Sequence, residues 1–318
     1  MGSRVITPSV NTGSSGLSGR SLEENPHYRE LNLAANHIYF WDRYEPVPQE
    51  IAGLVQLIKR DRDSPGPSPV DIQHDADLYH LLLGTAKSEV VEYFKNKIFP
   101  KPRCSDNLIR NDRITMAKHT LPDTGSGPKL SITVPEMLYG YRGTAFGGQH
   151  PQLISMGTEM IADNHLNSLL YPFLVIEFKD DGESMLVAAN QCMGGSVSYI
   201  NIAESLNHGL RQCKSDSVHP IDVAAFSIAM NGSEARINIA WKENELGIYM
   251  VNFNVFHLHD PQQYIKFRKY VRNIIDWCKG ARPGSDSQVH RHPHRGELEG
   301  SFSDSQVPQA TAVGRSCG

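Results

Sequence analysis

Several features that define large protein classes are missing from this sequence of 318 residues. It has no run of about 18 apolar residues, which a membrane-spanning helix requires. Its first residues contain no apolar segment of the kind found in a secretory signal. The five cysteines are scattered and form no Cys-x-x-Cys pair, so we expect neither a disulfide framework nor a zinc ribbon. We therefore expect an intracellular protein of the nucleus or cytoplasm, neither secreted nor associated with membranes.

Common signatures of nucleotide-binding and hydrolytic enzymes are also absent. The sequence contains no Gly-x-Ser-x-Gly elbow, no P-loop and no Gly-x-Gly-x-x-Gly motif, which argues against α/β-hydrolases, NTPases and dinucleotide-binding enzymes. The formal net charge is -4, so the overall composition does not indicate an obligate polyanion binder. With 39% hydrophobic and 21% charged residues, the composition is typical of one large globular domain or two small ones.

The composition and the hydrophobic pattern divide the chain into four regions. Residues 1–26 are rich in Ser and Gly, and residues 281–318 in Ser, Gly and Pro; such segments bury little apolar surface, and we expect both to be disordered. Residues 27–74 have helical patterns and are expected to form an N-terminal helical extension. Residues 75–280 are expected to form the main domain.

The N-terminal half of the chain predicts helices. Residues 28–40 have a helical pattern, and residues 48–60 place Ile51, Leu54, Val55 and Ile58 at helical spacing. Residues 75–98 predict one long helix or two, interrupted near Gly84.

The remainder alternates between strand and helix patterns. Asn231-Gly232 is a strong hairpin signal between two strands. Gly194-Gly195 weakens an otherwise helical stretch, unless a close contact there requires glycine. Asp260 is a predicted N-cap followed by Pro261. The predicted strands are residues 113–119, 129–134, 171–179, 223–230, 235–241 and 247–258, and the further helices are residues 152–170, 184–212 and 261–280. This order predicts an α/β (α+β) fold with a central mixed sheet flanked by helices.

The stretch YPFLVIEFKDDG, residues 171–182, places charges at the end of an apolar strand. Because side chains alternate along a strand, Glu177 and Lys179 share one face, while Ile176 and Phe178 share the other. Burying such charges is costly unless they are paired or bound to an ion. The pattern therefore indicates a functional site, although a structural ion pair would have the same sequence.

A second acidic residue stands about forty positions upstream, in Val134-Pro135-Glu136-Met137. An acidic residue after a proline, followed by a strand that carries Glu-x-Lys, is similar to the PD-(D/E)XK nuclease pattern. The stretches YPFLVIEFKDDG, AANQCMGGSVSYINIAESLN and YVRNIIDWCKGAR closely resemble a family of fungal PD-(D/E)XK nuclease-like proteins. The resemblance covers residues 75–282 and implies a restriction-endonuclease-like core.

The resemblance also implies a metal-dependent nuclease or nuclease-like phosphodiesterase, with Mg²⁺ or Mn²⁺ as cofactor. Glu136 and Glu177 align with metal-binding positions, and Lys179 with the residue that assists the attacking water. Gln191, on the following helix, aligns with a glutamine that helps the site. Glu89 or Glu92 on the first core helix would be a further metal ligand.

One departure from the family pattern bears on activity. The pattern prefers Asp after the proline, whereas this chain has Glu136, whose extra methylene moves the carboxylate by about one bond length, ~1.5 Å. The alternative function is therefore a catalytically degenerate nuclease fold that binds nucleic acid or a protein partner.

The local charge pattern is compatible with nucleic acid as the partner, without indicating DNA or RNA. Residues 87–118 contain eight basic and four acidic residues, and residues 266–282 contain six basic residues and one acidic residue. Both stretches also contain aromatic residues, and such stripes can follow a phosphate backbone. Solvated helix faces with aromatic side chains turned inward would show the same pattern.

Overall fold

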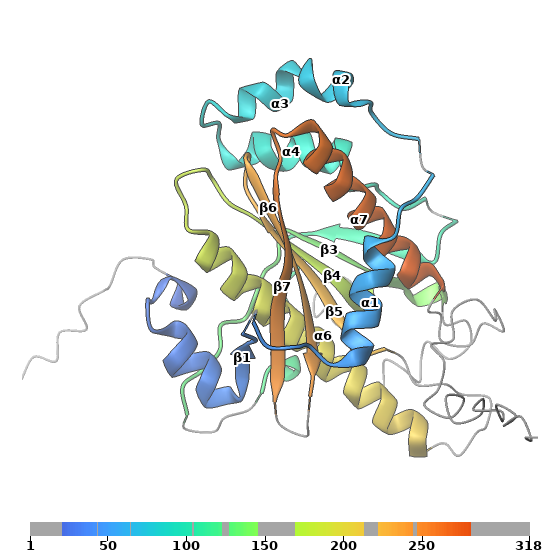
Figure 1. Ribbon diagram of the computed structural model, residues 1–318. Coiled ribbons are helices and arrows are strands. Elements are labelled where there is room, and N and C mark those ends of the chain that lie inside the picture. The colour runs from blue at the N-terminus through green and yellow to red at the C-terminus, as the bar shows by residue number, and fades with distance from the viewer. Residues whose placement is uncertain are drawn as a thin grey trace, which may run out of the picture. The chain divides into compact units, whose positions relative to one another are not determined.

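A seven-stranded mixed sheet is the centre of the described part of the chain (Figure 1). The strand order is β1-β7-β6-β5-β4-β3-β2, with β1 parallel to β7, β4 parallel to β5, and all other neighbours antiparallel. The strands are β1 (Ile38–Phe40), β2 (Leu108–Asp112), β3 (Met137–Arg142), β4 (Leu169–Phe178), β5 (Ala225–Met230), β6 (Glu234–Lys242) and β7 (Ile248–His257). The structure, a computed structural model, describes residues 21–42, 44–63, 65–103, 105–122, 127–145, 169–212, 222–243 and 247–280, all within the compact unit Met1–Gly284.

Strand β4 is buried along its whole length, as its continuous apolar sequence predicts. Its neighbour β5 is parallel to it, so the chain must cross from one end of the sheet to the other between them. The helix α6 (Met185–Gln212) is part of this connection. This strand–helix–strand unit fixes the end of β4, where the charged residues lie.

Helix α6 packs against β4 and β5, and two glycines allow the close approach. A Cβ atom on Gly195 would lie 2.9 Å from Cγ1 of Val175 on β4, and a Cβ on Gly194 would lie 2.5 Å from Cγ2 of Thr133. Both distances are too short for a real Cβ contact. The glycine pair that weakens the helix pattern is therefore explained by two close contacts of α6, one with the sheet at Val175 and one with the connection before β3 at Thr133.

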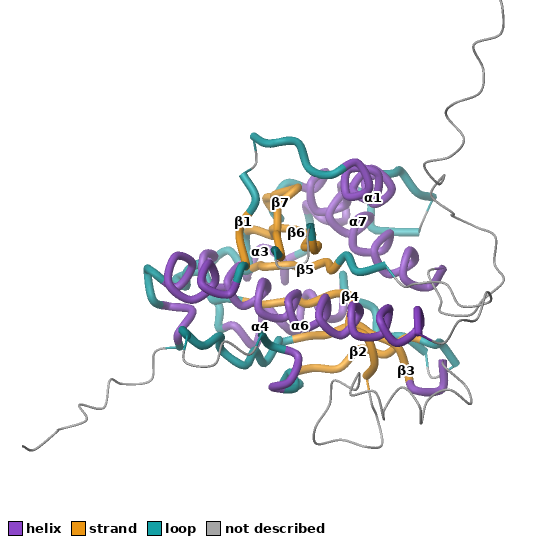
Figure 2. The backbone as a smooth tube through the Cα atoms, turned by 90° about the horizontal axis from the view of Figure 1, so that it is seen from below, coloured by secondary structure: helices purple, strands orange, loops and turns teal. Residues whose placement is uncertain are grey.

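The opposite face of the sheet is covered by α4 (Lys87–Lys97) and α7 (Pro261–Gly280). Phe178 of β4 meets Phe99 at a ring-centroid distance of 6.0 Å, and Phe99 in turn meets Phe267 of α7 at 6.3 Å. Helix α1 (Gln49–Lys59) packs against α7, and Figure 2 shows these two helices side by side, apart from α6. The short helices α2 (Pro69–Gln73) and α3 (Ala76–Leu81) precede α4.

Many local predictions are confirmed. Helix α1 buries all four residues of its predicted stripe, and Gly84 separates α3 from α4 with a φ of 82°. The hairpin between β5 and β6 turns at Asn231, whose Oδ1 accepts hydrogen bonds from the backbone N–H of Ser233 and Glu234. Asp260 caps α7 by accepting from the backbone N–H of Gln262 and Gln263.

The N-terminal region differs from its prediction. Residues 28–40 do not form one helix: a π-helix (Tyr28–Leu33) and a 3₁₀ turn (Ala34–Asn36) lead into β1, which pairs with β7. The region is thus partly an edge strand of the sheet, because Ile38 gains burial by pairing there. Leu22–Glu24 also form a 3₁₀ turn within the segment that was expected to be disordered.

The prediction of two strands before the central strand, over residues 113–119 and 129–134, is wrong. Residues 113–117 and 129–134 have no strand conformation; β2 ends at Asp112, and β3 begins only at Met137. Their apolar residues instead pack in connections, where Met116 N–H donates to the carbonyl of Thr133. Glu136 consequently precedes a strand instead of following one. The predicted helix over residues 152–170 lies almost entirely outside the described residues, as does the tail 281–318.

Candidate active site

Glu177 and Lys179 lie at the end of β4, on the face that α6 covers. Their side chains alternate with Phe178, which points toward α7, as the period of a strand requires. Glu177 is 3% exposed and Lys179 is 7% exposed. The backbone N–H of Lys179 donates to the carbonyl of Met230, so β5 holds this end of the strand in register. Two ionisable groups are therefore fixed inside the protein on paired backbone.

Glu136 is placed beside Glu177 by the pairing of β3 with β4. These strands are antiparallel, and Met137 pairs with Ile176; the residue before Met137 therefore stands opposite the residue after Ile176. Glu136 also acts electrostatically on Glu177. The structure thus brings together the three residues that the nuclease pattern singles out, although Glu136 reaches the site from the start of β3.

A second lysine, which the sequence pattern did not reveal, completes the group. Nζ of Lys87, in the first turn of α4, lies 2.6 Å from Oε1 of Glu136. The Lys87 side chain is 31% exposed and that of Glu136 is 14% exposed, so the pair is partly shielded from water. Lys179 has a longer contact of 4.0 Å with Glu183 at the turn before α6. Lys87 and Lys179 therefore bring two ammonium groups close to the carboxyl groups of Glu136 and Glu177.

Burial raises the pKa of Glu177 to about 8, and repulsion from Glu136 adds to the effect. Lys87 and Lys179 act in the opposite direction without overcoming it. The cause is physical: a carboxylate that loses its hydration and faces a second carboxylate is more stable with its proton. Additional positive charge nearby would favour the ionised form of Glu177.

Glu23 is a third buried carboxylate near the site, and it comes from the segment that was expected to be disordered. Its residue is 5% exposed, and its charge contributes to the raised pKa of Glu177. Asn190 of α6 fixes this segment, because its Nδ2 donates to the carbonyl of Glu23 and its Oδ1 accepts from Nε of Arg29. In the sequence, Glu23 and Glu24 lie in a polar stretch, which is typical of a segment exposed to solvent. This pattern therefore does not indicate that Glu23 is buried near the site.

Gln191 lies on α6 between Asn190 and Cys192. Cys192 is fully buried and close to Glu177. Oε1 of Gln191 is buried and has no hydrogen-bond donor among the described residues. A buried acceptor of this kind is costly unless a partner reaches it. Gln191 thus has an unused acceptor on the helix that covers the site.

The two glutamates of α4 show no hydrogen bond or ion pair with this group among the described residues. Glu89 and Glu92 are both exposed on α4, and Oε2 of Glu89 lies 3.8 Å from Nε2 of His80. Neither acts on the pKa of Glu177. Of the residues on α4, Lys87 is the one that contacts the candidate site in the described structure.

The donor set suits Mg²⁺ better than a metal that needs a protein cage. Among the described residues there is no group of three His, Cys, Asp or Glu that could hold an ion. Mg²⁺, however, is commonly bound through one or two carboxylates, with water and substrate phosphate as its other ligands. Glu136 and Glu177 provide two carboxylates, burial and repulsion from Glu136 raise the pKa of Glu177, and the buried Oε1 of Gln191 on α6 has no donor among the described residues. The residues present therefore fit a hydrated Mg²⁺ or Mn²⁺.

Comparison with known proteins identifies the family. Residues 80–284 match the family model described as Domain of unknown function (DUF7924), and the chain belongs to this family. Its description states no activity. No curated protein matches the sequence. The matched range includes β2 to β7 and Glu136, Glu177 and Lys179, whereas Glu23 lies before it. None of the described helices is long and apolar enough to cross a membrane.

Proposed function

We propose that this protein is a metal-dependent nuclease or nuclease-like phosphodiesterase that hydrolyses nucleic-acid phosphodiester bonds, with Mg²⁺ or Mn²⁺ as cofactor. The observation that carries the proposal is the convergence of Glu136, Glu177 and Lys179 on one face of the sheet, where burial raises the pKa of Glu177 to about 8. Perturbed, buried carboxylates beside a lysine are typical of catalytic sites.

Each side chain has a distinct role in this proposal. Glu136 and Glu177 would hold the cation, which when bound supplies positive charge to the phosphate and acidifies water. Lys179 is positioned two residues after Glu177 on the same face and would stabilise the negative charge that develops on the phosphate. Gln191 would accept a hydrogen bond from water in the site. Asn190 would hold Glu23 and its segment over this end of the sheet.

The pairing of Lys87 with Glu136 favours a second candidate function. The ammonium of Lys87 already pairs with one of the two carboxylates, so the negative charge of Glu136 is compensated without a metal ion. In this alternative the nuclease fold has lost catalysis and binds nucleic acid or a protein partner. A metal ion must displace Lys87 or share Glu136 with it for the first function to hold.

The test is cleavage of labelled single- and double-stranded DNA and RNA in Mg²⁺, in Mn²⁺ and in EDTA. Glu177→Gln and Lys179→Met should each lower metal-dependent cleavage by about 100-fold or more, because each removes a group that acts on the transition state. Glu89→Gln is the matched control, since it removes an exposed carboxylate whose contact is with His80. Circular dichroism would verify that each variant is folded.

A second measurement separates the two candidate functions. Binding of Mg²⁺ or Mn²⁺ to the native state raises the melting temperature, and Glu177→Gln should abolish that rise. Folded wild-type protein that neither cleaves any substrate nor responds to either metal would contradict the nuclease proposal and support the degenerate binding fold.

A further inference from the structure

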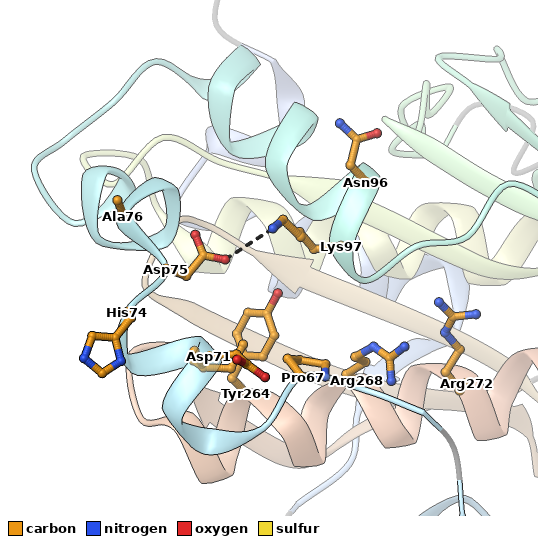
Figure 3. Close-up of a pocket in the computed structure, with 11 residues that line it drawn as sticks. Pro67, Asp71, His74, Asp75, Ala76, Asn96, Lys97, Tyr264, Arg268 and Arg272 are labelled. Carbon is orange, nitrogen blue, oxygen red and sulfur yellow. Dashed lines mark ion pairs between the residues drawn. The ribbon is translucent and has the colours of Figure 1, made fainter.

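A polar cavity lies on the α7 side of the sheet, whereas Glu177 faces α6. The cavity has a volume of about 570 Å³. It is bounded by the segment from Pro67 to Ala76, the end of α4, and α7 (Figure 3). Lys97 comes from the first basic stretch of the sequence, while Arg268 and Arg272 come from the second. Folding thus gathers cations that are far apart in the chain around one cavity.

The acidic residues of the cavity are already held by other groups. Asp75 caps α3 by accepting from Leu78 N–H, and its Oδ2 also accepts from the Tyr93 hydroxyl at 3.0 Å and lies 3.4 Å from Nζ of Lys97. Asp71 forms a capping box with Ser68 at the start of α2. Both carboxylates therefore already have hydrogen-bond partners around the cavity, and Asp75 neutralises Lys97.

In the part of the chain that the structure describes, the two arginines of the cavity, unlike Lys97, form no ion pair with its carboxylates. Arg268 and Arg272 lie one helical turn apart on α7, and Figure 3 shows both guanidinium groups rising from this helix toward α4. Among the described residues no hydrogen bond or ion pair is found for Arg268, and the buried Nε of Arg272 has no acceptor. Two half-buried like charges side by side are unfavourable unless an anion lies between them.

The lowered pKa of Arg272 agrees with a positive charge that lacks an anionic partner. Burial lowers the pKa of Arg272, and repulsion from Arg268 and Arg62 adds to the effect, while Tyr139 and Asp276 oppose it. An anion in the cavity would reverse that direction. Guanidinium groups bind phosphate through paired, charge-assisted hydrogen bonds.

We propose that this cavity binds a phosphomonoester of about nucleotide size, with its phosphate between Arg268 and Arg272. The volume is within the range of small-molecule sites, roughly 300–1,000 Å³, and exceeds what a lone phosphate would fill. The phosphate could be that of a free nucleotide or that of a 5′-phosphorylated strand end, since both present the same group. This site is separate from the metal-dependent chemistry proposed at Glu177 and does not depend on it.

The test is a binding titration of the full chain in EDTA, so that no metal-dependent contact at Glu177 contributes. The probes are adenosine 5′-monophosphate, followed by calorimetry, and a short labelled single-stranded DNA with a 5′-phosphate or a 5′-hydroxyl, followed by anisotropy. The variants are Arg268→Gln, Arg272→Gln and the double variant. Lys266→Gln is the matched control, because Lys266 is an exposed cation on the same helix, near the Tyr270 ring and outside the cavity.

Each single arginine substitution should weaken binding of the phosphorylated probes by about tenfold or more, the double variant should abolish it, and Lys266→Gln should leave it unchanged. Loss of binding should occur without a lower melting temperature, because the substitutions relieve repulsion between like charges. Tighter binding of the mononucleotide would identify a free nucleotide as the ligand. Tighter binding of the 5′-phosphorylated strand would identify a strand end.

Three binding results would overturn the proposal. They are no binding of any phosphorylated probe by folded wild type, equal binding by wild type and the double variant, and equal binding of the 5′-phosphate and 5′-hydroxyl strands. A fall in the melting temperature of Arg272→Gln to below that of Lys266→Gln would instead show that Arg272 serves to stabilise α7, and would also overturn it.

Discussion

Nζ of Lys87 lies 2.6 Å from Oε1 of Glu136, and this contact joins the first turn of α4 to the residue that precedes β3. The contact matters because Glu136 stands opposite Glu177, whose pKa of about 8 reflects burial and the nearby carboxylate. A lysine that neutralises one carboxylate competes with a metal ion for it. Under the proposed function, the balance between Lys87 and the metal ion decides whether the metal occupies this site.

Replacing Lys87 by methionine tests this competition. Lys87→Met should lower the melting temperature of the metal-free protein, because it leaves Glu136 unpaired in a partly buried site; we expect a loss of about 1 kcal/mol, since the lysine is partly exposed. The rise in melting temperature on adding Mg²⁺ or Mn²⁺ should become larger than in wild type. Differential scanning calorimetry with and without EDTA measures both effects.

Lys95→Met is the matched control for this experiment. Lys95 is on the same helix and pairs with Asp112 on β2, so its loss removes an equal charge without touching Glu136. An identical metal response in wild type, Lys87→Met and Lys95→Met would show that Lys87 does not compete with a metal.

The raised pKa of Glu177 predicts how stability depends on pH. Its pKa in the unfolded chain is near 4.5, whereas in the folded protein it is about 8. Between these values the folded state holds a proton that the unfolded state has released, so stability falls as the pH rises. Below about pH 4.5 Glu177 is protonated in both the folded and the unfolded state, so it no longer makes stability depend on pH.

Glu177→Gln removes this titration. The free energy of unfolding of the variant, relative to wild type, should increase by up to about 1.4 kcal/mol for each pH unit between pH 5 and pH 8. Urea unfolding in EDTA at several pH values measures the difference. A constant difference across this range would show that Glu177 is already ionised in the folded protein.

The close approach of α6 to the connection before β3 predicts an unusual response to alanine. Alanine normally favours a helix over glycine by about 1 kcal/mol, but Gly194→Ala should destabilise the protein by about 1–3 kcal/mol because its Cβ would overlap Cγ2 of Thr133. Thermal unfolding measures the change. Thr133→Ser removes the overlapping methyl group, so the double variant should recover part of the loss.

Gly182→Ala serves as the control for this series. A Cβ at Gly182, in the turn after β4, would meet no atom within 4 Å, and its stability should remain within about 0.5 kcal/mol of wild type. A stabilising Gly194→Ala substitution would contradict the tight packing of α6 against Thr133.

The hydrogen bonds of Asn190 predict local opening of the N-terminal segment. Asn190→Ala leaves the Glu23 carbonyl and the Arg29 guanidinium without their partner, which should cost about 1–3 kcal/mol. Hydrogen exchange followed by mass spectrometry should show faster exchange in residues 22–33 than in β4. Asn96→Ala, at an exposed position of α4, should leave exchange unchanged.

If exchange in Asn190→Ala increased equally in residues 22–33 and in β4, the Asn190 contacts would support the whole sheet. The segment would then not be a separate cover for the candidate site, and Glu23 would have only a structural role.

The sequence by itself determined the features that depend on neighbours in the chain. A period of two places Glu177 and Lys179 on one face of β4, and the confirmed alternation with Phe178 follows from strand geometry alone. Capping by Asp260 and the turn at Asn231 are equally local, because each side chain bonds backbone only a few residues away. The mixed α/β sheet follows from the order of such elements.

Tertiary structure decided what depends on distant partners. Glu136 stands opposite Glu177 because β3, which begins at the next residue, pairs with β4, and Lys87 reaches Glu136 across 49 positions. Glu23 approaches the site because Asn190, on a helix far along the chain, binds its backbone. Lys97 and Arg268 line one cavity for the same reason. Periodicity specifies a face, but the groups that meet across it depend on packing between elements that are far apart in the sequence.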